Sequence, residues 1–254
     1  MVNVFFEVHS GLPREGPGDN ESTRKAYLML QNLPEKPRIL DVGCGPGMQT
    51  IELAKLSNGR VDAVDNHQPF LEDVKKKAKN EGVSDRIRIV NGDMRALLYP
   101  NRSFYLVWSE GAIYIIGFEK GLREWKKLLK PKGYIVVSEL SWLKPNPPEE
   151  VKEFFKEGYP QIKTIGENLE IARKAGYSIV GYFPIPEKSW WTNYYMPIEA
   201  KIAGMKMKYK DDKEAMQILR VEELEIDMFR KYSDCYGYVF YILQVSDKKV
   251  HQKT

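Results

Sequence analysis

The segment from Arg38 to Thr50, RILDVGCGPGMQT, constrains the fold more than any other part of the sequence. It begins with a short run of mostly branched apolar residues, which is typical of a strand buried on both faces of a sheet. Gly43, Gly45 and Gly47 follow, and the apolar spacing from Met48 to Leu56 predicts a helix. Glycine permits positive φ and close approach of a ligand to the backbone. We therefore expect a tight turn that brings bare backbone N–H groups to a ligand at the helix N-terminus.

The spacing of these glycines separates two classes of nucleotide site. Nicotinamide and flavin proteins use G-x-G-x-x-G to place a pyrophosphate at the helix N-terminus. Here the pattern is D-x-G-x-G-x-G, and Gly47 comes one residue too early for that fingerprint. Asp41 stands two residues before the first glycine, where a carboxylate can accept a hydrogen bond from a ligand ammonium group. A tight turn with no ligand is the alternative.

Strand and helix patterns alternate along the rest of the chain. We expect further strands at residues 60–64, 86–90, 103–108, 134–140, 177–183 and 237–245. Asp65 ends the second strand, 18 residues after Gly47, and a carboxylate there can accept hydrogen bonds from both hydroxyls of a ribose. Asn66 can assist it. Asp62 is the competing carboxylate, but it lies in mid-strand, where we expect it to face a helix or solvent.

The chain resembles the class I S-adenosylmethionine-dependent methyltransferases, specifically the type 11 (ubiquinone/menaquinone-biosynthesis-like) group. The resemblance rests on DVGCGPG, on Asp65 and on LLKPKGYIVVSE, and it covers residues 38–142 well. It implies an α/β fold with a Rossmann-like, doubly wound seven-stranded sheet of order 3-2-1-4-5-7-6, the last strand antiparallel, with helical insertions. It also implies S-adenosyl-L-methionine as cofactor and S-adenosyl-L-homocysteine as product. One departure is Tyr105, which stands in the fourth strand where many members carry Asp.

The resemblance assigns the cofactor site residue by residue. It places Asp93 at the exocyclic amine of adenine and the backbone N–H of Met94 at a ring nitrogen, although a simple turn aspartate would look the same. The predicted cofactor-binding residues are Asp41, Gly43, Gly45, Gly47, Asp65, Asn66, Asp93, Met94 and Ser109.

Three residues are candidates for catalysis because they follow central strands, where open α/β sheets place ligands. They are Glu110, Tyr114 and Glu139. For Glu110 and Tyr114 the alternatives are a helix cap and a core aromatic. The methyl donor is already activated, so alignment is the main task, and a base is needed only if the acceptor binds in its protonated form.

The acceptor is expected to contact aromatic residues outside the nucleotide-binding part. EKSWWTNYYMP is dense in aromatic side chains, which can stack on a flat or cationic acceptor, although ordinary packing is the alternative. The predicted acceptor-pocket residues are His9, Arg14, Trp142, Trp190, Trp191, Tyr194 and Tyr195.

The length of 254 residues fits one domain with additions. We expect residues 1–19 to form an irregular N-terminal arm, residues 141–176 a helical segment after the fifth strand, and residues 184–234 an aromatic and helical insertion between strands six and seven. A capping box at Thr164 and Glu167 is also predicted.

Composition narrows the function further. The net charge of +4 is close to balanced, and no Asn/Asp-Pro-Pro-aromatic motif follows the fourth strand, so nucleic acid is not expected as a partner. With two cysteines and no apolar window of spanning length, we expect no metal, no membrane contact and a cytoplasmic location. The main prediction is methyl transfer to a small-molecule acceptor, with a homodimer possible. Alternatives are an RNA or protein methyltransferase, a non-catalytic cofactor-binding module and a nicotinamide-dependent oxidoreductase.

Overall fold

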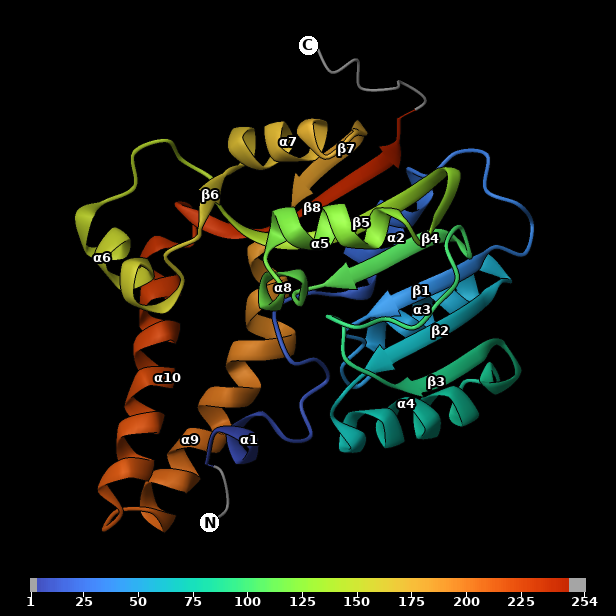
Figure 1. Cartoon of the computed structure of the whole chain (residues 1–254). Helices are drawn as coiled ribbons and strands as arrows, with labels where there is room; N and C mark the ends of the chain where they lie inside the picture. Colours follow the sequence, from blue (N-terminus) through green and yellow to red (C-terminus); the bar gives the residue numbers. More distant parts are fainter. Residues whose placement is uncertain (1–3, 247–254) are drawn as a thin grey trace.

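The computed structural model describes residues 4–246, so residues 1–3 of the predicted arm lie outside the described residues. Figure 1 shows a twisted sheet with helices on both faces and a helical projection beside one end. None of the helices within residues 4–246 has the length and apolar character that a membrane crossing requires.

The sheet has the predicted strand order. Its main strands are β1 (Arg38–Val42), β2 (Arg60–Asp65), β3 (Ile87–Asn91), β4 (Phe104–Glu110), β5 (Leu129–Trp142), β7 (Tyr177–Pro184) and β8 (Tyr236–Val245). They are arranged β3-β2-β1-β4-β5-β8-β7, and β8 is antiparallel to both of its neighbours. The predicted order is confirmed, because β7 and β8 are the sixth and seventh strands of the prediction. An additional two-residue strand, β6 (Lys163–Thr164), pairs with β5.

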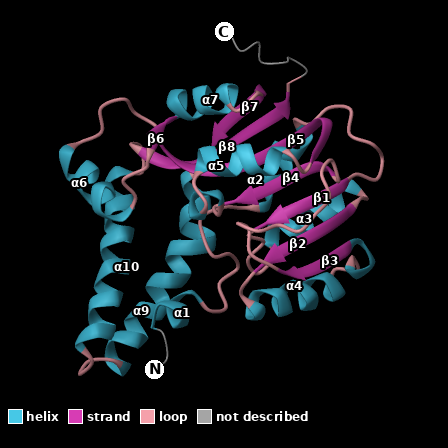
Figure 2. Ribbon diagram, in the orientation of Figure 1, coloured by secondary structure: helices cyan, strands magenta, loops and turns pink. Residues whose placement is uncertain are grey.

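The helices are distributed between the sheet and the projection, as Figure 2 shows. They are α1 (Val4–His9), α2 (Asn20–Leu28), α3 (Met48–Ser57), α4 (Gln68–Asn80), α5 (Phe118–Lys126), α6 (Glu149–Gly158), α7 (Ile165–Lys174), α8 (Glu187–Trp190), α9 (Met196–Lys208) and α10 (Lys213–Tyr232). A π-helical turn, Trp191–Tyr195, joins α8 to α9. The predicted capping box at the start of α7 is present, with Thr164 and Glu167 bonded to each other's backbone.

The core consists of two layers, one on each face of the sheet. In β1, Ile39 packs into one layer and the next residue, Leu40, into the other, and both are fully buried. In Figure 1, α5 and α7 lie in front of the sheet and α2 and α3 behind it. Burial of one such side chain contributes about 1.5–3 kcal/mol. These layers hold the central strands in place and thereby fix the positions of their carboxyl ends.

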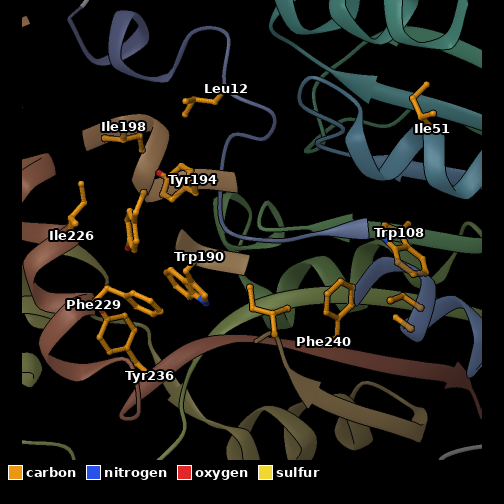
Figure 3. Packing of buried hydrophobic residues seen from close by; sticks show 14 of the residues in the cluster. Leu12, Ile51, Trp108, Trp190, Tyr194, Ile198, Ile226, Phe229, Tyr236 and Phe240 are labelled. Atoms are coloured by element: carbon orange, nitrogen blue, oxygen red, sulfur yellow. The ribbon is translucent and has the colours of Figure 1, made fainter. Parts of the chain in front are cut away.

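The projection is formed by α9 and α10, with α1 packed against them. Trp190 stacks on Phe229 of α10 with ring centroids 4.2 Å apart, and Figure 3 shows these rings beside Tyr194 and Tyr236. The expectation of an irregular arm is wrong for Val4–His9, which form α1. A six-residue helix is not stable alone, so tertiary packing of Val4 and Val8 explains why local sequence signals missed it.

Candidate active site of two adjoining cavities

A cavity of about 300 Å³ lies at the carboxyl ends of β1, β2 and β4, directly beside the glycine turn. We call it the glycine-loop cavity. Its walls include Phe6, Arg14, Glu15, Gly16, Pro17, Gly43, Cys44, Gly45, Asp65, Asn66, Phe70, Asp93, Met94, Glu110, Gly111 and Tyr114. This is the edge at which open α/β sheets bind ligands.

The turn requires glycine for two reasons. Gly43 has φ +71° and Gly45 has φ +51°, a backbone region that residues with side chains rarely adopt. A Cβ atom on Gly43 would also lie 2.5 Å from the Cβ of Ala112, well inside van der Waals contact. The backbone at this point therefore forms a bare, closely fitted wall of the cavity.

The N–H groups of the turn are used within the protein. Those of Gly43 and Cys44 donate to the carbonyl oxygen of Val64 at 2.9 and 3.0 Å, and that of Gly45 donates to Asp65 Oδ2 at 2.9 Å. The expectation that the turn presents bare N–H groups to a ligand is wrong at these three positions. A turn whose donors are occupied is not an anion-binding nest, which disfavours a pyrophosphate at this point.

Asp65, Asn66, Asp93 and Met94 line the glycine-loop cavity as the sequence predicts. The second oxygen of Asp65 accepts the backbone N–H of His67 at 2.9 Å. Each carboxylate oxygen has two lone pairs, so both keep capacity for a ligand hydroxyl. At Asp93 the hydrogen bonds from Arg95 lower the pKa of the carboxyl. Asp62 lies elsewhere and pairs with Arg38 at 2.9 Å.

Three predicted cofactor residues do not line the cavity. Asp41 is fully buried below the turn, where its Oδ2 accepts Thr50 Oγ1 at 2.6 Å and burial raises its pKa to about 7. Gly47 has φ +85°, and a Cβ atom there would lie 2.7 Å from a side chain of α4. Ser109 donates its hydroxyl to the carbonyl of the last residue of β1. All three residues stabilise the glycine turn and the strand end beneath it, and none of them lines the cavity.

The segment between α1 and α2 crosses the glycine-loop cavity. Arg14 forms an ion pair with Glu110, and both side chains are almost completely buried. The other oxygen of Glu110 accepts Thr23 Oγ1 at 2.7 Å and Trp108 Nε1 at 2.8 Å. Nη1 of Arg14 has no hydrogen-bond partner among residues 4–246. Glu110 is therefore engaged in holding this segment, and the unpaired Nη1 of Arg14, a residue of the cavity wall, is itself buried.

A second cavity, of about 420 Å³, adjoins the first; we call it the aromatic cavity. Its walls come from α1, α6, α8, the π-helical turn, α10 and β8. The two cavities share Phe6, Glu15, Gly16, Pro17, Phe70, Gly111 and Tyr114. A ligand in one therefore lies next to a ligand in the other.

Four of the predicted acceptor-pocket residues line the aromatic cavity, and three do not. His9, Trp190, Tyr194 and Tyr195 are in its wall, whereas Arg14 lines the glycine-loop cavity. The other two lie apart from both cavities. Trp142 packs edge-on against Phe155, and Trp191 donates its ring N–H to Glu187.

The three predicted catalytic residues differ in whether a ligand could contact them. Tyr114 lines both cavities and is 45% exposed, so it can reach a ligand. Glu139 is buried outside their walls and accepts a hydrogen bond from Tyr159, which does line the aromatic cavity. Burial raises the pKa of Glu139 to about 7. Glu110 is occupied as described above.

Several polar wall residues of the aromatic cavity were not indicated by the sequence, among them Glu15, Glu222, Glu225, Tyr236 and Tyr238. Glu222 lies 3.3 Å from Nε2 of His9, and Tyr195 donates to Glu225 at 3.0 Å. The one signal in the sequence was the spacing of the two glutamates, three residues apart on a helix, which places them on one face. That spacing is common on solvated helices, so it did not indicate burial.

Comparison with known proteins agrees with this geometry. Residues 39–133 match the family model described as a methyltransferase domain. The sterol 24-C-methyltransferase of Neurospora crassa is 24% identical over 190 residues, covering 70% of this chain and 50% of that protein. The chain thus spans about half the length of the curated relatives it matches first.

Solved structures share the fold over almost the whole chain. A SAM-dependent methyltransferase of Geobacter sulfurreducens, in complex with S-adenosyl-L-homocysteine, has a TM-score of 0.81 at 20% identity and covers 96% of this chain and 98% of that chain. The [4+2]-cyclase SpnF has a TM-score of 0.72 at 19% identity, covering 96% and 91%. The predicted resemblance is therefore confirmed: residues 39–133 match the methyltransferase-domain family, and the chain shares its fold with a solved S-adenosylmethionine-dependent methyltransferase.

Proposed function

We propose that this protein is an S-adenosylmethionine-dependent methyltransferase that acts on a small molecule. The observation that carries the proposal is the pair of adjoining cavities, one beside the glycine turn and one enclosed by aromatic side chains, with a shared wall. Methyl transfer requires two ligands whose reacting atoms are held about 3–3.5 Å apart. Two small cavities with a common boundary satisfy that requirement without further assembly.

The glycine-loop cavity fits an adenosyl amino acid better than a dinucleotide. The N–H groups at positions 43–45 are occupied, so the turn offers a close backbone surface and no phosphate nest. Asp65 would hold the ribose, Asp93 and Met94 the adenine, and the free Nη1 of Arg14 a carboxylate. Bound there, S-adenosylmethionine supplies a methyl group activated by its sulfonium.

The residue we propose for contact with the acceptor is Tyr114, because it alone of the three predicted catalytic residues lines both cavities. Glu110 already accepts three hydrogen bonds, so its proposed role is to position the segment at 14–17. Glu139 acts through Tyr159 rather than on a ligand. The protein thereby aligns two ligands and excludes water, which is the main requirement of this reaction.

Calorimetric titration with S-adenosyl-L-homocysteine tests the proposal. We expect one-to-one binding, lost in Gly43→Ala because the added methyl group collides with Ala112. Gly166→Ala is the matched control, since a Cβ atom there meets nothing within 4 Å. Absence of binding to the unmodified protein would overturn the proposal. Fluorescence enhancement of NADH on mixing would instead support a nicotinamide enzyme.

The second candidate function is a protein that binds the cofactor without transferring its methyl group. The shared fold with a [4+2]-cyclase is the observation that favours this candidate. Binding of the cofactor without methyl transfer to any of a broad acceptor panel would support it. An RNA or protein methyltransferase is less favoured, because the aromatic cavity is of small-molecule size. The homodimer and the cytoplasmic location stay predictions.

A further inference from the structure

We propose, on the basis of the methyltransferase function above, that the acceptor is an amine bound as an organic cation, with its nitrogen near Glu222 and Glu225 and its apolar body against the aromatic rings. Three features of the wall of the aromatic cavity favour this chemical class of ligand.

The first feature is the sign of the charge. Glu15, Glu222 and Glu225 line the cavity, and none of the described residues in its wall is Lys or Arg. Lys201, the nearby cation, donates to backbone carbonyls of α1. A ligand with a phosphate or carboxylate would meet like charges here, whereas a cation would pair with them.

The second feature is the aromatic lining. Trp190, Tyr194, Tyr195 and Tyr238 present rings to the cavity, and Trp190 lies in an aromatic cluster visible in Figure 3. Aromatic faces attract ammonium groups through the negative potential of the ring face. They also give an apolar body a dry surface. Rings and carboxylates together select a ligand that is cationic at one end and apolar elsewhere.

The third feature is an unused polar atom. The hydroxyl group of Tyr236 is buried and has no hydrogen-bond partner within residues 4–246, although Tyr236 lines the cavity. Such a group costs free energy unless a ligand or water satisfies it. Its oxygen can accept an N–H from a bound amine. This observation is independent of the glutamates and points to a polar ligand atom at the same place.

The carboxylates also lack the stabilisation that a cation would provide. Burial raises the pKa of Glu225 to about 6 and that of Glu15 to about 7. The charge of His9 lowers both pKa values; Lys201 and Lys77 also lower that of Glu15, and the hydrogen bond from Tyr195 lowers that of Glu225. Asp65 raises the pKa of Glu15, and Glu222 raises that of Glu225. A bound ammonium would lower both pKa values and so keep both carboxylates ionised and able to accept the proton that the nitrogen releases. The freed nitrogen lone pair would then form the N–C bond as the C–S bond of the sulfonium breaks, with S-adenosyl-L-homocysteine as the leaving group.

The test uses three probes with one apolar body: 2-phenylethylamine, 2-phenylethanol and phenylacetate. Each is titrated calorimetrically into the protein, with and without saturating S-adenosyl-L-homocysteine. We expect the amine to bind at least tenfold more tightly than the alcohol and the carboxylate not to bind. Equal or tighter binding of the alcohol or the carboxylate, or no binding of any probe, would overturn the inference.

Variants on α10 locate the site. Glu225→Gln keeps an acceptor for Tyr195 but removes the charge, so the preference for amine over alcohol should fall to about twofold or less. Glu223→Gln is the matched control, because Glu223 pairs with Lys206 and does not line the cavity. An unchanged preference in Glu225→Gln would overturn the assignment. If the protein does not bind S-adenosyl-L-homocysteine but still prefers the amine, the methyltransferase proposal is contradicted, whereas the selectivity of the aromatic cavity for a cation is not.

Discussion

The two cavities are built in contrasting ways. The glycine-loop cavity is formed mainly by backbone and by residues at the ends of consecutive strands, between Gly43 and Ile115. The aromatic cavity is formed by side chains from segments as distant in sequence as Phe5 and Tyr238. The first depends on turn geometry fixed by a few residues, and the second depends on the packing of the whole projection. Substitutions in the two should therefore affect different measurements.

The largest expected effect is on folding and comes from the aromatic cavity. Trp190→Ala should lower the free energy of unfolding by about 3–5 kcal/mol, because it removes a buried ring stacked on Phe229. Denaturant titration measures it. Affinity of the remaining folded protein for S-adenosyl-L-homocysteine should be unchanged. Trp191→Ala removes a less buried ring outside the cavity and should lower the free energy of unfolding by a smaller amount. An equal loss of stability in the two variants would contradict the role of Trp190.

The next effect is on cofactor affinity and comes from the glycine-loop cavity. Asp65→Ala removes the acceptor of the Gly45 and His67 N–H groups and the proposed ribose contact. We expect affinity for S-adenosyl-L-homocysteine to fall about 10- to 100-fold, from one or two charged hydrogen bonds. Asp62→Asn, in the same strand but outside the cavity, is the control. Unchanged affinity in Asp65→Ala would remove the ribose assignment.

A smaller effect is on the pH dependence of stability. Asp41 has an ordinary pKa of 3.8, raised by burial to about 7 in the folded protein. Between these values the unfolded chain releases a proton that the folded protein keeps, so the free energy of unfolding falls as the pH rises. Asp41→Asn should make that slope shallower by up to about 1.4 kcal/mol per pH unit.

Denaturant titrations at several pH values measure the slope. Asp93→Asn is the control, because the pKa of Asp93 is lowered by hydrogen bonds from Arg95 and its contribution is lost at lower pH. A slope unaffected by Asp41→Asn would mean that Asp41 is ionised in the folded protein.

The smallest effect should lie outside both cavities. Thr164→Ala removes one half of the capping box of α7 and should lower the free energy of unfolding by about 1 kcal/mol. Binding of both ligands should be unchanged. A change in either affinity would show that the cavities depend on the start of α7, which lies beside the carboxyl end of β5.

The contrast between the two cavities also explains which site residues could be predicted from the sequence. Asp65, Asp93 and the glycines sit at fixed intervals from strands that are recognisable one at a time, so their places at the strand ends were foreseeable. The sheet order and the adenine contacts of Asp93 and Met94 were implied by the family resemblance. The sequence also predicted Asp41, Gly47 and Ser109 as cofactor-binding residues. Spacing alone could not show that Asp41 and Ser109 lie outside the cavity wall and form hydrogen bonds within the protein.

The aromatic cavity was predictable only in part. The density of rings at 190–195 indicated an aromatic site, but Trp190 and Trp191 are equivalent in sequence, and only tertiary packing shows which ring lines the cavity. Glu222, Glu225 and Tyr236 are brought there by α10 and β8, which approach the arm only in the folded chain. No short segment carries that information.

The ion pair between Arg14 and Glu110 has a consequence for successive catalytic cycles. It ties residues 15–17 to the end of β4, and these residues belong to the wall of both cavities. A displacement that releases spent cofactor would also open the neighbouring chamber to solvent. In the proposed methyl transfer, an acceptor would then leave in the same event, so that each encounter would add a single methyl group and the transfer would be distributive rather than processive.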